Sequence, residues 1–133
     1  MGVIFDTSEI IALEREDRTV EGIIQGREDE PFGISVITVA ELLHSVERAD
    51  TQARKIKRQA FVEKVIEFFP VFPFEPTTAR IYARLWALLA AQRLVVGSHD
   101  LIIAATALSM DYTIITANMR DFGKIEGLKV EKL

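Results

Sequence analysis

The sequence predicts an α/β domain in which a short parallel sheet of four to five strands is covered by helices on both faces. Short, almost wholly apolar runs alternate with longer segments whose apolar residues recur at helical spacing. Central parallel strands are buried on both faces and therefore carry continuous apolar runs, and strands that alternate with helices join into a parallel sheet. No linker, repeat or low-complexity stretch interrupts the chain, so residues 1–133 are expected to form a single domain.

The first half of the chain predicts two strands, each followed by a helix. Residues 2–5 form an apolar run, and after Asp6-Thr7-Ser8 the apolar residues return at helical spacing. A second short helix is expected at 17–26 and a second strand at 34–37. Thr38 and Glu41 match the S/T-x-x-E capping-box pattern, which predicts that the next helix begins at Thr38.

The second half predicts the remaining strands and helices. Pro70 ends one long helix, and Gly97 and Ser98 interrupt the chain before a very apolar one. In chain order, the elements are a helix at 51–69, a strand at 71–74, a helix at 76–92, a helix from 100 to 110, a strand at 113–116 and, to complete five, a strand at 128–130.

Composition restricts the class of protein. The chain has no cysteine, which excludes disulfides and thiolate metal sites. It lacks an apolar stretch long enough to cross a bilayer, and no basic residue precedes its first apolar run as in a signal peptide, so we expect a soluble, cytoplasmic protein. The net charge of −4 is unlike that of a non-specific nucleic-acid coat protein.

Four acidic residues, far apart in sequence, map to one edge of the predicted sheet. Asp6 ends the first strand, Glu41 lies in the helix after the second, Asp100 begins the apolar helix, and Asp121 follows the strand at 113–116. Ligands of open parallel sheets bind beyond the carboxyl ends of the strands. Each acid also has a simpler structural interpretation: Asp6 as a helix cap, Glu41 as part of the capping box, and Asp121 as a turn residue.

Asp100 is the hardest of the four to explain structurally. It adjoins Leu101, Ile102 and Ile103, and a buried carboxylate needs a helix N-terminus or a cation nearby. Clustered carboxylates repel one another unless they share a proton or bind a divalent ion. Oxygen ligands favour Mg²⁺ or Mn²⁺, which activates water and stabilises charge on a phosphate. The cluster therefore indicates phosphodiester hydrolysis.

Four segments in this order, FDTSEI, TVAELL, SHDLIIAATAL and TANMRDF, resemble the PIN-domain nucleases and, more closely, the VapC-type toxins of toxin–antitoxin pairs. The resemblance spans residues 3 to about 130. It implies an α/β/α sandwich, dependence on Mg²⁺ or Mn²⁺, and endonucleolytic cleavage of structured RNA such as tRNA. It also implies inhibition by a cognate VapB-like antitoxin and assembly as a homodimer.

By the same resemblance, Asp6 and Asp100 would be the principal metal ligands, and Glu41 would ligate directly or through water. Where many members carry an acid after the strand-ending threonine, this chain has Asn118. Either Asp121 or the amide oxygen of Asn118 would then fill the fourth position. The remaining auxiliary candidates are two hydroxyls, which could equally serve only to cap a helix and end a strand: Thr7 and Thr116.

Two other features have alternative interpretations. A basic run is either a solvated helix face or a contact for RNA phosphates; it comprises Arg54, Lys55, Lys57 and Arg58. Tyr82 and Trp86 form a second apolar stripe on the helix expected at 76–92. Its first interpretation is part of the core, its second is a dimer or antitoxin interface, and its third is a surface that stacks on bases.

Two other classes of function compete with the nuclease. A phosphoacceptor receiver domain is disfavoured, because the third strand ends at Phe74-Glu75-Pro76 and no acidic pair precedes it as that function requires. A PIN-like domain that binds RNA or a partner without cleavage remains the alternative.

Overall fold

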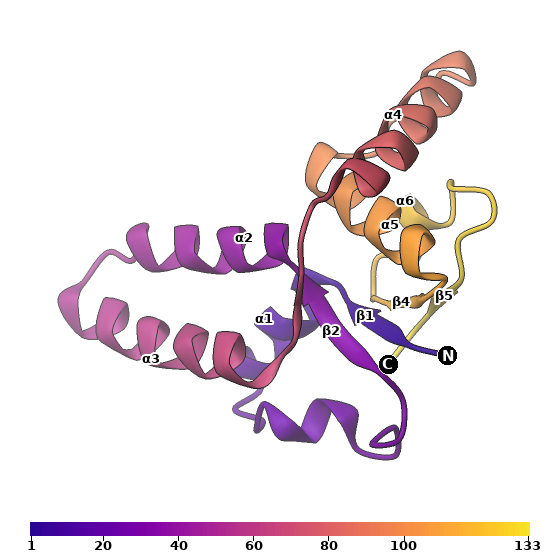
Figure 1. Cartoon of the computed structure of the whole chain (residues 1–133). Helices are drawn as coiled ribbons and strands as arrows, with labels where there is room; N and C mark the ends of the chain where they lie inside the picture. Colours follow the sequence, from indigo (N-terminus) through magenta and orange to yellow (C-terminus); the bar gives the residue numbers. More distant parts are fainter.

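Five parallel strands form one central sheet in the computed structural model, which describes residues 1–133 (Figure 1). The strands are β1 (Val3–Phe5), β2 (Phe32–Ser35), β3 (Val71–Phe72), β4 (Thr113–Ile115) and β5 (Val130–Glu131). Their order is β3-β2-β1-β4-β5, and every neighbouring pair is parallel. From β1 the chain first adds β2 and β3 on one side of the sheet, and then adds β4 and β5 on the other side of β1. The topological switch point therefore lies between β1 and β4.

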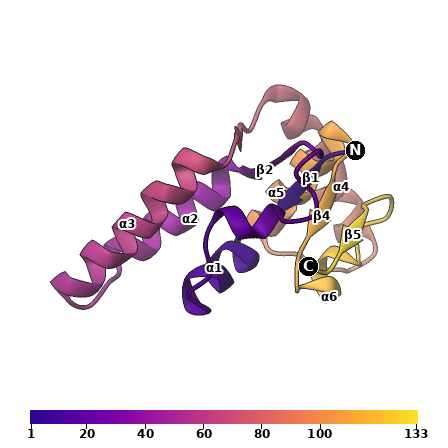
Figure 2. The same cartoon turned by 90° about the horizontal axis from the view of Figure 1, so that it is seen from below.

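Helices cover both faces of this sheet. They are α1 (Thr7–Arg15), α2 (Val36–Glu47), α3 (Gln52–Phe68), α4 (Pro76–Ala91), α5 (Ser98–Met110) and the short α6 (Met119–Phe122), with a 3₁₀ turn, η1 (Glu21–Ile24). Figure 1 shows the α2–α3 hairpin on one side of the sheet and α4 with α5 on the other. Seen from below, α2 and α3 lie side by side and extend away from the strands (Figure 2). None of the helices combines the length and apolar character needed to cross a membrane.

Two apolar clusters, one on each face, hold the layers together. Along β1, Phe5 packs with residues of α1, α2 and α3, whereas its neighbour Ile4 packs with α4 and α5. Alternation of this kind follows from the two-residue period of a strand. On α5, burial extends nearly all round the helix, as the sequence predicts. The predicted α/β/α sandwich is therefore confirmed.

The N-terminus of α2 corrects the capping-box prediction. The strand predicted at 34–37 ends at Ser35, whose extended backbone makes it the N-cap residue, and its Oγ accepts a hydrogen bond from the backbone N–H of Ile37 over 3.1 Å. Thr38 consequently lies inside the helix with its side chain fully buried. Both residues are plausible caps by type, but the end of the strand selects Ser35.

Other boundaries shift by smaller amounts. The helix predicted at 17–26 is only the 3₁₀ turn η1, preceded by Asp17 in a left-handed conformation with φ 52°. The third strand is shorter than predicted, and the fifth begins two residues later than predicted. The short helix α6 was not predicted. None of these shifts moves an element to a different place in the sheet.

Candidate active site

The site begins at the switch point, where β1 and β4 end side by side. Phe5 of β1 pairs with Ile115 of β4, so the next residues, Asp6 and Thr116, are neighbours across the two strands. The backbone N–H of Asp6 donates to the carbonyl oxygen of Ile115 over 3.0 Å. The Thr116 hydroxyl donates to Asp6 Oδ2 over 2.8 Å. Parallel strand pairing therefore places Asp6 at the predicted edge of the sheet.

Asp6 occupies the N-cap position of α1, but its side chain makes no capping hydrogen bond. The side chain is 4% exposed, and Oδ2 accepts a second hydrogen bond, from Ser8 Oγ over 2.8 Å. Two hydroxyls thus orient one carboxylate oxygen, whereas Oδ1 has no hydrogen-bond partner. The simple capping interpretation of Asp6 is wrong, because neither carboxylate oxygen accepts a hydrogen bond from a backbone N–H of α1.

Glu41 is held from two sides. Its Oε1 lies 2.7 Å from the Thr7 hydroxyl, which also contacts the Thr38 hydroxyl over 2.9 Å. Its Oε2 lies 3.3 Å from Nδ1 of His99, the second residue of α5. These contacts join the first turns of α1 and α5 to α2 through a single carboxylate. Thr7, the first residue of α1, therefore contacts Glu41, which a residue that only caps a helix would not need to do.

Asp100 has no protein partner at all. It lies half-buried in the first turn of α5, and its carboxylate accepts no hydrogen bond and forms no ion pair. Burial and the negative charges of Asp6, Glu41 and Asp121 raise the pKa of Asp100 to about 6, against a smaller lowering by His99. The negative charges of Asp6, Glu41 and Asp121 therefore act on Asp100 from one region of the fold.

Asn118 and Asp121, the two candidates for the fourth position, form hydrogen bonds with each other and with Lys124. Asn118 caps α6: its Oδ1 accepts from the backbone N–H of Asp121 over 3.3 Å, and its Nδ2 donates to Asp121 Oδ2 over 3.2 Å. Lys124 Nζ donates to Asp121 Oδ1 over 3.2 Å. The hydrogen bonds from Asn118 and Lys124 lower the pKa of Asp121. Both Asp121 oxygens and the Asn118 amide oxygen thus already have protein partners.

One buried acid was missed by the sequence reasoning. Glu9, on α1, is only 7% exposed. Burial and the charge of Asp6 raise its pKa, while Arg18 and a hydrogen bond from the backbone of Ala117 act in the opposite direction. The available signal was its spacing, because a residue three positions after Asp6 lies on the same side of the helix start.

The carboxylate oxygens of this site suit a hard divalent cation, although they are too few to surround the ion without water molecules. In this arrangement no three His, Cys, Asp or Glu side chains form a ready metal-binding group. The unpartnered oxygens are those of Asp6 Oδ1 and the Asp100 carboxylate, whereas Glu41 is engaged by Thr7 and His99. A site with two protein carboxylates and several waters is the kind that Mg²⁺ adopts.

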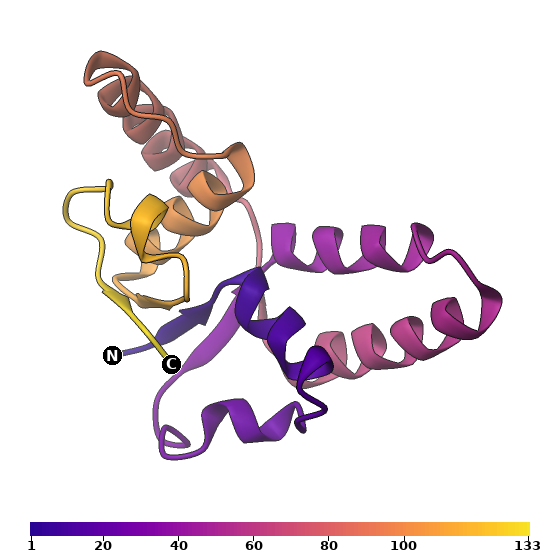
Figure 3. The ribbon, with the colours of Figure 1, turned by 180° about the vertical axis from the view of Figure 1, so that it is seen from behind.

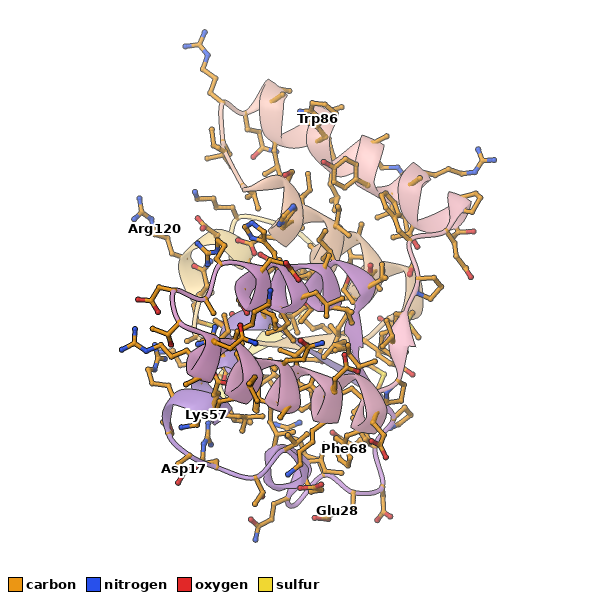
Figure 4. All side chains as sticks on the ribbon, turned by 90° about the vertical axis from the view of Figure 1, so that its left-hand side faces the viewer. Asp17, Glu28, Lys57, Phe68, Trp86 and Arg120 are labelled. Atoms are coloured by element: carbon orange, nitrogen blue, oxygen red, sulfur yellow. The ribbon has the colours of Figure 1, made fainter.

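The basic run lies on α3, away from these carboxylates, and most of it is already paired. Arg54 contacts Asp50 over 2.8 Å, Lys55 contacts Glu47 over 3.7 Å, and Arg58 Nε contacts Glu14 over 2.7 Å. Lys57, also a residue of α3, has no ion-pair partner, and Figure 4 shows its side chain at the surface. The RNA contact predicted for this run remains a prediction.

Thr116→Val is expected to reduce activity while leaving the fold intact. The substitution keeps the size of the side chain but removes the hydroxyl that orients Asp6 Oδ2 and accepts the N–H of Asn118. We expect roughly a 10- to 100-fold loss of activity, the range typical when a residue that orients a metal ligand is replaced. Steady-state cleavage assays would measure this, with Thr116→Ser as the control that restores the hydroxyl.

Comparisons with known proteins identify the family to which this chain belongs. The PIN domain family model matches residues 3–128. A Rickettsia felis protein named Ribonuclease VapC1 is 41% identical over 98% of this chain and 95% of its own. A Rickettsia bellii protein named Ribonuclease VapC is 37% identical over the same shares. The solved VapBC-5 complex of Mycobacterium tuberculosis contains a chain with TM-score 0.78 and 29% identity, with 100% of both chains covered. The chain therefore belongs to the PIN-domain family and, within it, to the VapC proteins.

Proposed function

We propose that this protein is an endoribonuclease, dependent on Mg²⁺ or Mn²⁺, that acts as the toxin of a toxin–antitoxin pair. One observation carries the proposal: Asp6 and Asp100 present unpartnered carboxylate oxygens at the switch point of the sheet, and the half-buried carboxylate of Asp100 forms no ion pair. A bound divalent ion would compensate these charges. The names of the Rickettsia relatives supply RNA as the substrate.

The roles of the residues follow from their contacts. Asp6 and Asp100 would hold the ion, and Glu41 would act through a water molecule because its oxygens already have protein partners. Thr116 and Ser8 fix the direction in which Asp6 Oδ1 points. The ion, when bound, lowers the pKa of water and stabilises negative charge on the phosphate. Asp121 would contribute its charge without ligating.

A structured RNA such as tRNA is the proposed substrate. Proteins from Salmonella typhimurium and Shigella flexneri, 32% and 31% identical over 74% of this chain, carry the name tRNA(fMet)-specific endonuclease VapC. Their similarity supports tRNA as the first substrate class to test. The position of the cut is a property of the RNA contacts, which the carboxylates alone do not determine.

The proposed partners are a VapB-like antitoxin and a second copy of the chain. Solved relatives include VapBC complexes from Salmonella typhimurium and Haemophilus influenzae, each 26% identical over 99% of this chain. On α4, Leu85 faces the core, whereas Trp86 is 63% exposed (Figure 4). The rings of Trp86 and Tyr82 meet edge to face. The core interpretation of this second stripe is therefore wrong for Trp86. Its exposure supports a partner interface there.

Cleavage assays test the proposal directly. Purified protein would be incubated with tRNA and with single-stranded RNA, with Mg²⁺, with Mn²⁺ or with a chelator, beside Asp6→Ala and Asp100→Asn. We expect cleavage of tRNA that requires the metal and both carboxylates. Cleavage that survives both chelation and substitution would contradict the mechanism. Metal-dependent binding of RNA without cleavage would instead favour the non-catalytic PIN-like domain.

A further inference from the structure

A cationic hollow lies between α1 and α3, apart from the acidic site. It has a volume of about 400 Å³ and is lined by Ile11, Glu14, Arg15, Arg54, Lys57 and Arg58. On each helix the lining residues are spaced i, i+3, i+4, which places them on one face. Two helix faces that are distant in sequence thus converge. We refer to this feature as the α1–α3 hollow.

The charge of the α1–α3 hollow is unbalanced. Four cationic side chains face one carboxylate, on a chain whose net charge is −4. Arg58 pairs with Glu14 inside the hollow, and Arg54 pairs with Asp50 at its rim. Arg15 and Lys57 have no acidic side chain within ion-pair distance, and both are exposed. Such crowded cations repel one another, and an anion entering between them removes that repulsion.

The position of the hollow relative to Asp6 favours one kind of anion. Asp6 is the N-cap of α1 and Arg15 is its last residue, so about 14 Å of helix axis separates them at about 1.5 Å per residue. Figure 3 shows α1 running from the end of β1 toward α3. Phosphates of one strand of B-form DNA follow one another at about 3.4 Å along the axis, and the rise of A-form RNA is smaller, so roughly four nucleotides or slightly more span that distance. An RNA strand held at Asp6 can therefore also reach the hollow.

We propose that the α1–α3 hollow binds a backbone phosphate of the RNA, a few nucleotides from the bond that is cleaved. This inference rests on the proposed ribonuclease function. Guanidinium groups match the paired oxygens of a phosphodiester, and Lys57 adds a further positive charge to the same hollow. The contact is to the backbone, so it positions the RNA without reading its sequence.

Binding of fluorescently labelled tRNA in the presence of chelator tests the inference independently of cleavage. The test variant is Arg15→Ala/Lys57→Ala, which removes the two cations without ion-pair partners and leaves both ion pairs in place. The matched control is Lys64→Ala/Lys132→Ala, which removes two exposed, unpaired cations outside the hollow. Anisotropy titrations over a range of salt concentrations would give the affinity and its salt slope.

We expect the test variant to bind RNA about tenfold more weakly. Its salt slope should be smaller by about 1, the change expected for one lost phosphate contact. The control should match the wild type. Unchanged affinity and slope in the test variant, or no wild-type binding at low salt, would overturn the inference. Binding of polyglutamate to the wild type and the test variant checks whether the hollow instead takes an acidic peptide. Loss of polyglutamate binding in the test variant, with RNA binding retained, would also overturn the inference. Absence of cleavage with RNA binding as expected would count against the proposed function alone.

Discussion

Asp100→Asn is expected to make the metal-free protein more stable at neutral pH. Burial and neighbouring negative charges raise the pKa of Asp100 to about 6 in the folded protein, from a usual value of 3.8. A raised carboxylate pKa means that the folded state loses stability as pH rises between these two values. Removing the carboxylate removes that loss. After allowance for solvent screening at a half-buried site, we expect a gain of about 1 to 2 kcal/mol at pH 7.5.

Urea denaturation in the presence of chelator would measure this gain. The difference between Asp100→Asn and the wild type should be largest above pH 7 and should vanish below about pH 3, where the carboxyl is protonated in both the folded and the unfolded state. Asp29→Asn is the matched control, because Asp29 is exposed and has no ion pair. A clear loss of stability in Asp100→Asn at pH 7.5 would show that the protein itself stabilises this carboxylate.

Asp6→Asn is expected to abolish most of the cleavage activity while preserving the fold. The amide can still accept hydrogen bonds from Thr116 and Ser8, so the local structure has no reason to rearrange. The negative charge that would hold the ion is lost. Because replacing residues that merely orient a metal ligand already costs about 10- to 100-fold, we expect loss of at least about 100-fold here.

Single-turnover cleavage of tRNA at saturating metal would measure the Asp6→Asn effect, with circular dichroism as the check on folding. Asp29→Asn again controls for the loss of one negative charge. Recovery of Asp6→Asn activity at much higher Mn²⁺ concentration would support a ligand role. Activity within threefold of the wild type at ordinary metal concentration would contradict it.

The fold was predictable because its determinants are local. Apolar runs predicted the strands, and apolar residues at helical spacing predicted the helices. Their alternation predicted a parallel sheet between helical layers, which the structure confirms. Asp6, Glu41 and Asp100 could be placed at one edge for the same reason, since the carboxyl ends of parallel strands meet there. The rise in the pKa of Asp100 that the charges of Asp6 and Glu41 help to cause follows from that placement.

Other features depend on contacts that no local pattern encodes. Ser35 and Thr38 are both suitable caps, and only the end of β2 decides between them. The contact of Glu41 with Thr7 and with His99, from two other helices, joins residues far apart in the chain. The α1–α3 hollow requires Arg15 to meet a helix face about 40 residues later in the chain, a long-range contact that the sequence did not reveal.

Titration calorimetry with Mn²⁺ at pH 7.5 tests the central claim, that Asp6 and Asp100 together bind a divalent ion. We predict one saturable site per chain in the wild type, lost or greatly weakened in both Asp6→Asn and Asp100→Asn and unchanged in Asp29→Asn. The affinity should fall as pH is lowered through 6, because the proton on Asp100 competes with the ion. Equal Mn²⁺ affinity in the wild type and in both active-site variants would contradict the claim.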